Sequence, residues 1–320
     1  MEIVGDPRHR RLMGASIRYG IPFLADETVD IVGIESGTLF QFPPGAEPIM
    51  DGDLSEWDIV PEDYYVPFDS HFEYYLGLGQ ENDESNLSFR VVAGWSAGTN
   101  RLYFMMERFD NYWDRNGVGA VAAGDDSWEI MIDSDHGGEQ HWYSADDFED
   151  ADELQRNMGR FSQVAHCVWP EMPDANRAVG RKWFFNSNST WQDEAPWGDY
   201  GFQLDGEINS GEVTARVEVM SAAWDDFNWV GPDDSQIHTF TEGNTIGLGW
   251  VVHDMDSAEE DNGGASDGGW GINPNIQMWF DCANCSDFLL APIDPRVDFS
   301  NIPTAVEEES WGRIKAVYIQ

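Results

Sequence analysis

The chain of 320 residues is poor in lysine and in basic side chains generally. Its two lysines are Lys182 and Lys315, and 17 basic residues face 60 acidic ones, which gives a formal charge of −43. A surface with this charge repels nucleic acid and anionic lipid, so neither is expected as a partner. The same charge attracts cations and keeps a protein hydrated in a saline medium.

Cysteines and long apolar runs are scarce as well. Cys167, Cys282 and Cys285 cannot build a disulfide framework, because one of the three stays unpaired. The "CANC" pair lacks the further Cys or His that a zinc site needs, so a local disulfide or two inert thiols are expected. No run approaches the roughly 20 apolar residues of a membrane span. Residues 1–20 show no apolar stretch typical of a signal peptide.

The abundant pattern is a period-2 alternation of apolar and polar residues, which is typical of half-buried strands. It occurs, bounded by turn residues, in the segments 101–109, 127–133, 212–220, 245–254 and 276–281. In the third segment, four small apolar residues share one face, which is expected in the core: Val213, Ala215, Val217 and Val219. Helical periodicity is confined to residues 146–159 and to the C-terminal end, where Thr304 and Glu307 fit a capping box.

Many strands and few helices predict an all-β fold. We expect a two-sheet antiparallel β-sandwich of the jelly-roll or immunoglobulin-like kind, with long loop insertions and one or two short helices. The expected organisation is an N-terminal extension (1–45), a sandwich domain (46–300) and a C-terminal segment (301–320). A long polar stretch at about 134–211 interrupts the strand rhythm and is expected to be an insertion.

Enzyme motifs fail in their local context. "GASDG" (264–268) matches a serine nucleophile pattern but lacks the preceding strand, the following helix and a later His. "GVGAVA" (117–122) imitates a dinucleotide fingerprint, but no strand precedes it. The run from Asp133 lacks the spacing of a calcium helix-loop-helix motif, and the spacing of His136 and His141 favours a surface loop over a metal pair. The chain is therefore not expected to be an enzyme.

Five segments resemble, in order, the signature of one family. "PIMDGDLSEWDIVP" (48–61) resembles the D-G-x-L-x-E-W stretch of family 9 carbohydrate-binding modules, which belong to a wider group of DOMON-like β-sandwiches. The later signatures of that family are similar to the segments 100–114, 125–135, 212–226 and 245–257. The resemblance implies a two-sheet sandwich, often with bound calcium, whose sugar-binding members use exposed aromatic residues. The signature also occurs in domains without sugar affinity and in haem-binding relatives.

Acidic residues gather where the expected strands end. Clustered strand-end carboxylates can supply the six to eight oxygens that Ca²⁺ takes. The expected calcium ligands are Asp51, Asp53, Asp110, Asp126 and Asp133. Alternatively, Asp51 and Gly52 form a turn and the other acids are solvated strand ends. Calcium here would tie loops together and neutralise charge.

Tryptophan is unusually frequent, with 15 residues. Trp57, Trp128 and Trp250 lie in strand patterns and are expected in the core. A second set lies in polar, Gly- and Asp-rich contexts and provides the candidate sugar-binding residues: Trp113, Trp142, Trp191, Trp197, Trp229 and Trp270. Each of these could instead pack a loop onto the sandwich.

The function expected from these patterns is a non-catalytic, extracellular carbohydrate-binding β-sandwich that calcium stabilises, with a polysaccharide or glycan as its partner. An alternative is an extracellular structural or self-assembling subunit that associates through its N-terminal extension. A third is a haem-binding electron carrier, which the eleven Met and seven His would allow. The expected location is extracellular or at the cell surface.

Overall fold

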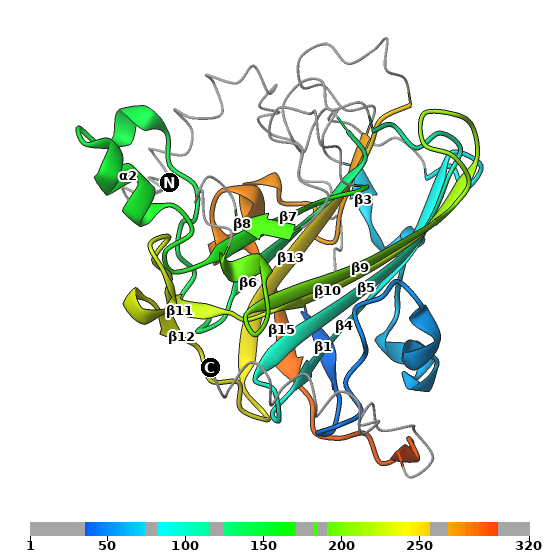
Figure 1. Cartoon of the computed structure of the whole chain (residues 1–320), viewed down its shortest axis with the longest axis horizontal. Helices are drawn as coiled ribbons and strands as arrows, with labels where there is room; N and C mark the ends of the chain where they lie inside the picture. Colours follow the sequence, from blue (N-terminus) through cyan, green and yellow to red (C-terminus); the bar gives the residue numbers. More distant parts are fainter. Residues whose placement is uncertain are drawn as a thin grey trace, which may run out of the picture.

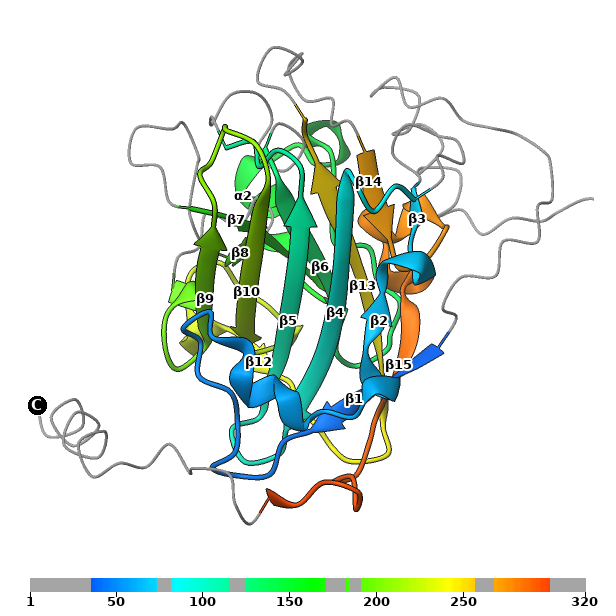
Figure 2. The same cartoon turned by 90° about the vertical axis from the view of Figure 1, so that its right-hand side faces the viewer.

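A computed structural model describes residues 36–73, 82–115, 125–170, 182–184, 191–256 and 268–299. These residues form a β-sandwich of two layers, seen from two sides in Figures 1 and 2. The first layer, sheet A, contains β3 (Phe72–Glu73), β6 (Ser127–Asp133), β7 (Gln163–Val168), β8 (Lys182–Phe184), β13 (Thr245–Asp254), β14 (Gly268–Gly271) and β15 (Ser286–Leu290). The second, sheet B, contains β2 (Val66–Pro67), β4 (Leu87–Ser96), β5 (Arg101–Asp110), β9 (Gly198–Asp205) and β10 (Val213–Ser221).

Short elements connect the strands. A separate hairpin consists of β11 (Trp224–Asp226) and β12 (Gln236–Ile237). The α-helix of the described part is α2 (Ala151–Asn157). The 3-10 turns are η1 (Leu54–Ile59), η2 (Glu62–Tyr64), η3 (Phe68–Ser70), η4 (Ala145–Asp147), η5 (Trp191–Asp193), η6 (Pro232–Asp234), η7 (Ile276–Trp279) and η8 (Cys282–Asn284). In the described ranges, no helix is long and apolar enough to cross a membrane.

One strand belongs to both sheets. β1 (Ser36–Gln41) pairs in parallel with β15 of sheet A through its first residues and with β4 of sheet B through its last two. The resulting strand order is β8-β7-β6-β13-β15-β1-β4-β5-β10-β9, and the other described pairings are antiparallel. The expected all-β sandwich is confirmed. However, β1, the strand that joins the two sheets, lies within residues 1–45, which we predicted to be an N-terminal extension.

The main core lies between the two sheets, where alternate residues of each strand point inward. Phe104 of β5 and Trp128 of β6 meet edge to face across the layers, with ring centroids 6.4 Å apart. The inward face of β10 carries the four small apolar residues predicted for it, all buried. Trp57, Trp128 and Trp250 are fully buried, as predicted.

Two sequence-based predictions differ from the structure. Residues 134–211 are not a simple insertion, because they supply β7, which pairs with β6, and β9, which is the edge strand of sheet B. The alternating segment 276–281 contains the 3-10 turn η7 instead of a strand, because the side chain of Asn275 accepts from Gln277 N and caps the turn. The predicted C-terminal capping box lies outside the described residues.

A second, smaller core covers the outer face of sheet B. The segment 50–60 packs there, with Trp57 against Phe42, and it is fastened to Glu218 of β10. One carboxylate oxygen of Glu218 accepts from Trp57 Nε1 (2.7 Å), and the other accepts from Gly52 N (2.8 Å). Gly52 has φ +82°, and a Cβ there would lie 2.8 Å from Gln203 N. These contacts give structural roles to Gly52 and Trp57 of the D-G-x-L-x-E-W pattern.

The buried Glu218 should make stability depend on pH. Burial raises its pKa from 4.5 to about 7, against the lowering effect of its hydrogen-bond donors. The folded protein therefore keeps a proton that the unfolded chain releases near its ordinary pKa, so the free energy of unfolding should fall as pH rises from 4.5 through about 7. Urea unfolding at a series of pH values should show a shallower fall for Glu218→Gln than for the wild type. Glu107→Gln, at a half-exposed position of β5, is the matched control. Parallel curves for Glu218→Gln and the wild type would contradict this assignment.

Candidate functional site

Three of the six tryptophans predicted to bind sugar meet at one surface, here called the Trp191 surface and defined by Trp191, Trp197 and Trp229. All three are half-buried. Trp191 Nε1 donates to the backbone oxygen of Trp229 at 3.2 Å, and the Trp191 ring meets the Trp197 ring edge-on at 6.3 Å. Trp191 also stacks on Phe227, with centroids 5.5 Å apart. The Trp191 ring is therefore held against the rings of Trp197 and Phe227, and its N–H group is bonded to the backbone of Trp229.

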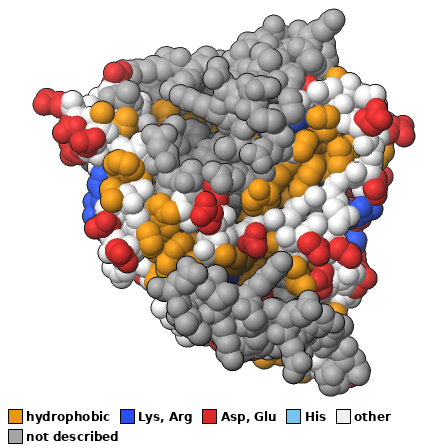
Figure 3. Space-filling model, viewed as in Figure 1, with side chains coloured by type: hydrophobic (Ala, Val, Ile, Leu, Met, Phe, Trp, Pro, Cys, Tyr) orange, Lys and Arg blue, Asp and Glu red, His pale blue; other side chains and the backbone are white. Residues whose placement is uncertain are grey.

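The Trp191 surface lies on the side of the sandwich where the two sheets are not joined. There, β9 of sheet B faces the end of β7, and the rings of Trp169 and Phe202 stack at 5.9 Å with an interplanar angle of 9°. The turn η5, which carries Trp191, contacts both β8 and β9. Figure 3 shows hydrophobic side chains at the surface around the β11–β12 hairpin and along β9. Aromatic residues thus close the open side while keeping part of their rings accessible.

The other three predicted tryptophans lie elsewhere. Trp113 and Trp270 are buried, and their indole N–H groups donate to Trp169 O and to Asn82 Oδ1, each at 3.1 Å. These two tryptophans belong to the core and not to an exposed platform. Burial is possible within a polar stretch of sequence because acceptors in loops bind their indole N–H groups. Trp142 is half-buried and packs edge-on against Phe280 at 5.5 Å.

A charged group lies beside the Trp191 surface. Asp226, next to Phe227 in the chain, accepts hydrogen bonds from Arg156 Nη2 (2.5 Å), Arg160 Nε (3.0 Å) and Arg160 Nη2 (3.1 Å). Burial raises the pKa of Asp226, but the hydrogen bonds and charges of the two arginines outweigh it, so the pKa is lowered. Arg156 also donates to Phe227 O at 2.7 Å. An ionised carboxylate and two guanidinium groups, held in place by these hydrogen bonds, therefore lie beside the aromatic rings.

A second charged group lies inside the sandwich. The guanidinium of Arg108, fully buried, contacts the carboxylates of Asp110, Asp126 and Asp254. Its face lies over the ring of Trp113, 4.9 Å from the centroid. Three carboxylates surround one guanidinium, and burial raises the pKa of Asp126 although Arg108 lowers it. The site therefore holds more negative charge than Arg108 alone can neutralise.

The five predicted calcium ligands do not converge on one point. Asp110 and Asp126 lie in the Arg108 group, whereas Asp133 lies at the other end of β6. A seven-residue strand is roughly 23 Å long, so Asp126 and Asp133 cannot share an ion. Asp51 and Asp53 lie in the exposed turn before η1, where each accepts a backbone N–H two residues later.

Among the described residues, two sets of carboxylates do come within reach of a common cation, with oxygens within 4.8 Å of one another: Asp110 with Asp254 and Asp256, and Asp133 with Asp135 and Glu139. In the second set, Gly137 N and Gly138 N donate to Asp133, which accounts for the position of its carboxylate. The first set contains Asp110 and Asp254, two of the three buried carboxylates whose total negative charge exceeds the single positive charge of Arg108. Its donors are hard oxygens, which Ca²⁺ prefers.

Several of these residues were not predicted from the sequence. Asp226 is more than 60 residues from Arg156 and Arg160 in the chain, and no local pattern marks their meeting. Asp254 and Asp256 carry a signal, since they form the D-x-D tail of the last signature strand. The C-x-x-C pair is a disulfide, one of the two states expected for it, and Cys167 is a buried cysteine outside this bond.

The described residues thus form an all-β sandwich. No protein-family model matches the chain, and no curated protein is significantly similar in sequence. Among solved structures, a family 9 carbohydrate-binding module from Caldicellulosiruptor kristjanssonii in complex with cellotriose is similar, with 11% identity over 83% of this chain and 100% of that one and a TM-score of 0.46. The same module in complex with glucose has a TM-score of 0.45 at 11% identity, over 82% of this chain and 98% of that one.

A putative carbohydrate-binding protein from Bacteroides uniformis is also similar, with 10% identity over 80% of this chain and 98% of that one and a TM-score of 0.38. The family that the five sequence motifs resemble is thus the one to which the first two structures belong. At these identities and TM-scores the likeness is a distant one of fold, and the sugars named are ligands of those proteins.

Removing the Arg108 guanidinium should strongly destabilise the sandwich. Arg108→Gln leaves three buried carboxylates without their counter-charge, a loss that typically costs about 3–5 kcal/mol. Urea unfolding measures this change. Arg216→Gln, which breaks a surface ion pair with Asp205, is the matched control and should cost less than about 1 kcal/mol. Similar losses for both variants would show that the buried group is not a stabilising centre.

Proposed function

We propose that this chain is a non-catalytic carbohydrate-binding β-sandwich whose glycan lies on the Trp191 surface. The observation that carries the proposal is the meeting of Trp191, Trp197 and Trp229, each half-buried, beside the ionised Asp226. A sugar presents apolar C–H groups on its ring faces and hydroxyl groups at its edges. Aromatic rings can stack on the C–H groups, and fixed polar groups can form hydrogen bonds with the hydroxyl groups.

The electrostatics of the surface support binding more than catalysis. A general acid for glycoside hydrolysis needs a raised pKa, so that it keeps a proton to donate near neutral pH. Asp226 has a lowered pKa and is held by Arg156 and Arg160. It therefore suits the role of a permanent acceptor for sugar hydroxyls. The two arginines offer donors on the same side.

Affinity electrophoresis in gels that contain xylan, soluble cellulose derivatives or acidic polysaccharides tests the proposal. We expect the wild type to be retarded by at least one of these polysaccharides. Trp197→Ala should weaken binding at least about tenfold, or about 1.4 kcal/mol, because it removes a stacking face. Trp142→Ala is the matched control, since Trp142 is half-buried but packs against Phe280.

The outcomes separate the possibilities. Wild-type protein that no polysaccharide retards would contradict the proposed function. Retardation that Trp142→Ala abolishes and Trp197→Ala leaves intact would contradict the location of the site. Thermal unfolding of each variant distinguishes a lost binding surface from a lost fold.

We also propose that calcium binds the buried set formed by Asp110, Asp254 and Asp256. Support comes from the excess of carboxylates around Arg108 and from oxygens that lie within 4.8 Å of one another. A cation there would neutralise charge in the interior and connect the end of β5 to the end of β13. Backbone oxygens and water would complete the shell that Ca²⁺ requires.

Chelation should lower the melting temperature, and Ca²⁺ at constant ionic strength should restore it. An ion that binds the folded state alone stabilises it by about 3 to 4 kcal/mol at roughly 100 to 1,000 times its Kd. Asp256→Asn should reduce this response, whereas Asp287→Asn, on the exposed face of β15, should keep it. Equal restoration by Na⁺, or no effect of chelation, would contradict the calcium site.

An extracellular location is part of the same proposal. The Cys282–Cys285 disulfide supports it, because disulfides persist mainly in oxidising compartments. The strongly acidic surface agrees with exposure to a saline medium.

A further inference from the structure

A cluster of ionisable residues lies on the outer face of sheet A, which is turned away from the main core. We propose that Glu129, His141 and His166 form an acid-sensitive latch that holds the segment 275–285 on sheet A. This segment contains η7, η8 and the Cys282–Cys285 disulfide. Acidification should release the segment while the sandwich stays folded.

Glu129 is the centre of the latch. Its neighbours Trp128 and Ile130 point into the main core, so the Glu129 side chain points to the opposite face of β6, where it is fully buried. His166 Nε2 of β7 lies 3.4 Å from one oxygen of Glu129, and His253 Nε2 of β13 lies 3.6 Å from the same oxygen. A carboxylate is thus buried between imidazole rings of the two neighbouring strands.

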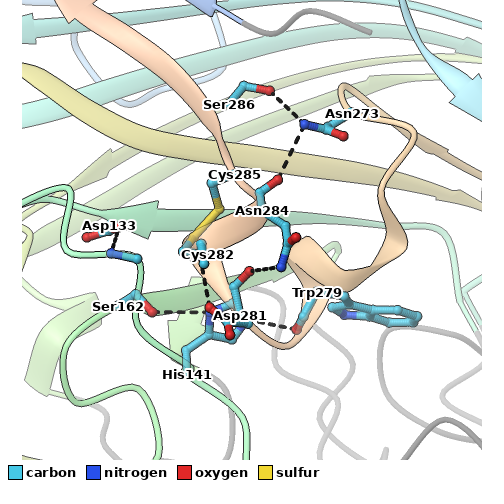
Figure 4. The surroundings of a disulfide bond; sticks show 12 residues. Asp133, His141, Ser162, Asn273, Trp279, Asp281, Cys282, Asn284, Cys285 and Ser286 are labelled. Carbon is cyan, nitrogen blue, oxygen red and sulfur yellow. Dashed lines mark hydrogen bonds between the residues drawn. A yellow bond between two sulfur atoms is a disulfide. The ribbon is translucent and has the colours of Figure 1, made fainter. Parts of the chain in front are cut away.

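The segment 275–285 is tied to this cluster through Trp279. His141 Nε2 donates to Trp279 O at 2.7 Å, and the Trp279 ring lies 5.5 Å from the ring of His253. Figure 4 shows the bond between His141 and Trp279 next to the disulfide. Backbone bonds add to the tie: His141 N donates to Phe280 O (3.0 Å), and Cys282 N donates to Glu139 O (3.2 Å).

Protonation opposes this closed arrangement. Burial lowers the pKa of His141 from 6.5 to about 4 and also lowers the pKa of His166. The pKa of Glu129 is lowered too, because His166, His253 and the Trp279 indole outweigh the effect of burial. When the segment opens, the histidines meet water and take up protons near their ordinary pKa. The closed state should therefore lose stability as pH falls from 6.5 towards about 4.

Other ionisable groups near the segment act in the opposite direction. Asp133 and Glu139 lie beside η8, and burial raises the pKa of Asp133 to about 7. Protonating Asp133 at lower pH removes a buried charge and favours the folded state. Glu218 behaves in the same way on sheet B. A local opening is thus expected without global unfolding, and a local measurement must detect it.

Hydrogen exchange of the full-length protein, measured by mass spectrometry at about pH 7.5 and about pH 5 and corrected for intrinsic rates, tests the latch. We expect amides of the segment 275–285 to lose protection at least about tenfold at the lower pH, while amides of β5 and β10 keep theirs. Unchanged protection of the segment would overturn the proposal. Loss of protection that is equal in the segment and in β5 would overturn it as well.

Variants assign the effect to the named groups. The double variant His141→Asn with His166→Asn should lose the acid response of the segment. His136→Asn should retain it, because His136 is an exposed histidine paired with Asp287. If the double variant does not fold, the wild type alone decides by NMR: the pKa read from the ring protons should be about 4 for His141 and below 6.5 for His166. Titration of both rings at or above 6.5 would overturn the proposal.

Discussion

The interaction on which the sandwich depends is the burial of Arg108 among carboxylates from three different segments. Asp110 ends β5 of sheet B, Asp126 precedes β6, and Asp254 ends β13 of sheet A. One guanidinium therefore connects both layers inside the fold. All three carboxylates contact the same guanidinium nitrogen, Nη2, and their attraction to the positive charge offsets part of the cost of burying them.

Buried carboxylates also lie where peripheral segments attach to the outer faces of the sheets. Glu218 accepts N–H groups from the segment that carries Gly52 and Trp57, and Glu129 lies between histidines beneath Trp279. In each case, a strand residue whose neighbours face the main core presents a buried acid on the outer face. The acidic composition is therefore more than a solvated surface, because several acids act as anchors for covering segments.

Much of the sandwich could be predicted from the sequence, because period-2 alternation is local. The inward face of β10 was predicted residue by residue, and so was the burial of Trp128 and Trp250. The burial of Glu218 could not be predicted, since it depends on a segment more than 150 residues away that covers the outer face. The role of β1 as the strand shared by both sheets depends equally on distant pairings.

The candidate sites were predictable only in part, for the same reason. A polar sequence context predicts accessible tryptophans, and Trp191, Trp197 and Trp229 are indeed half-buried. It fails for Trp113 and Trp270, whose indoles are buried against loop acceptors. The predicted calcium ligands were chosen because they end strands, but strand ends lie on opposite sides of a sandwich, so Asp126 and Asp133 are separated by the full length of β6.

The proposed glycan site lies where Trp191, Trp197 and Trp229 meet. The most direct test is an NMR titration of the assigned indole N–H signals with an oligosaccharide that the chain retains. We expect the signals of these three tryptophans to shift together and to saturate with one affinity, while the signal of the buried Trp57 stays unchanged. Shifts confined to Trp142 or Trp279, or no shift in any indole signal, would contradict the account.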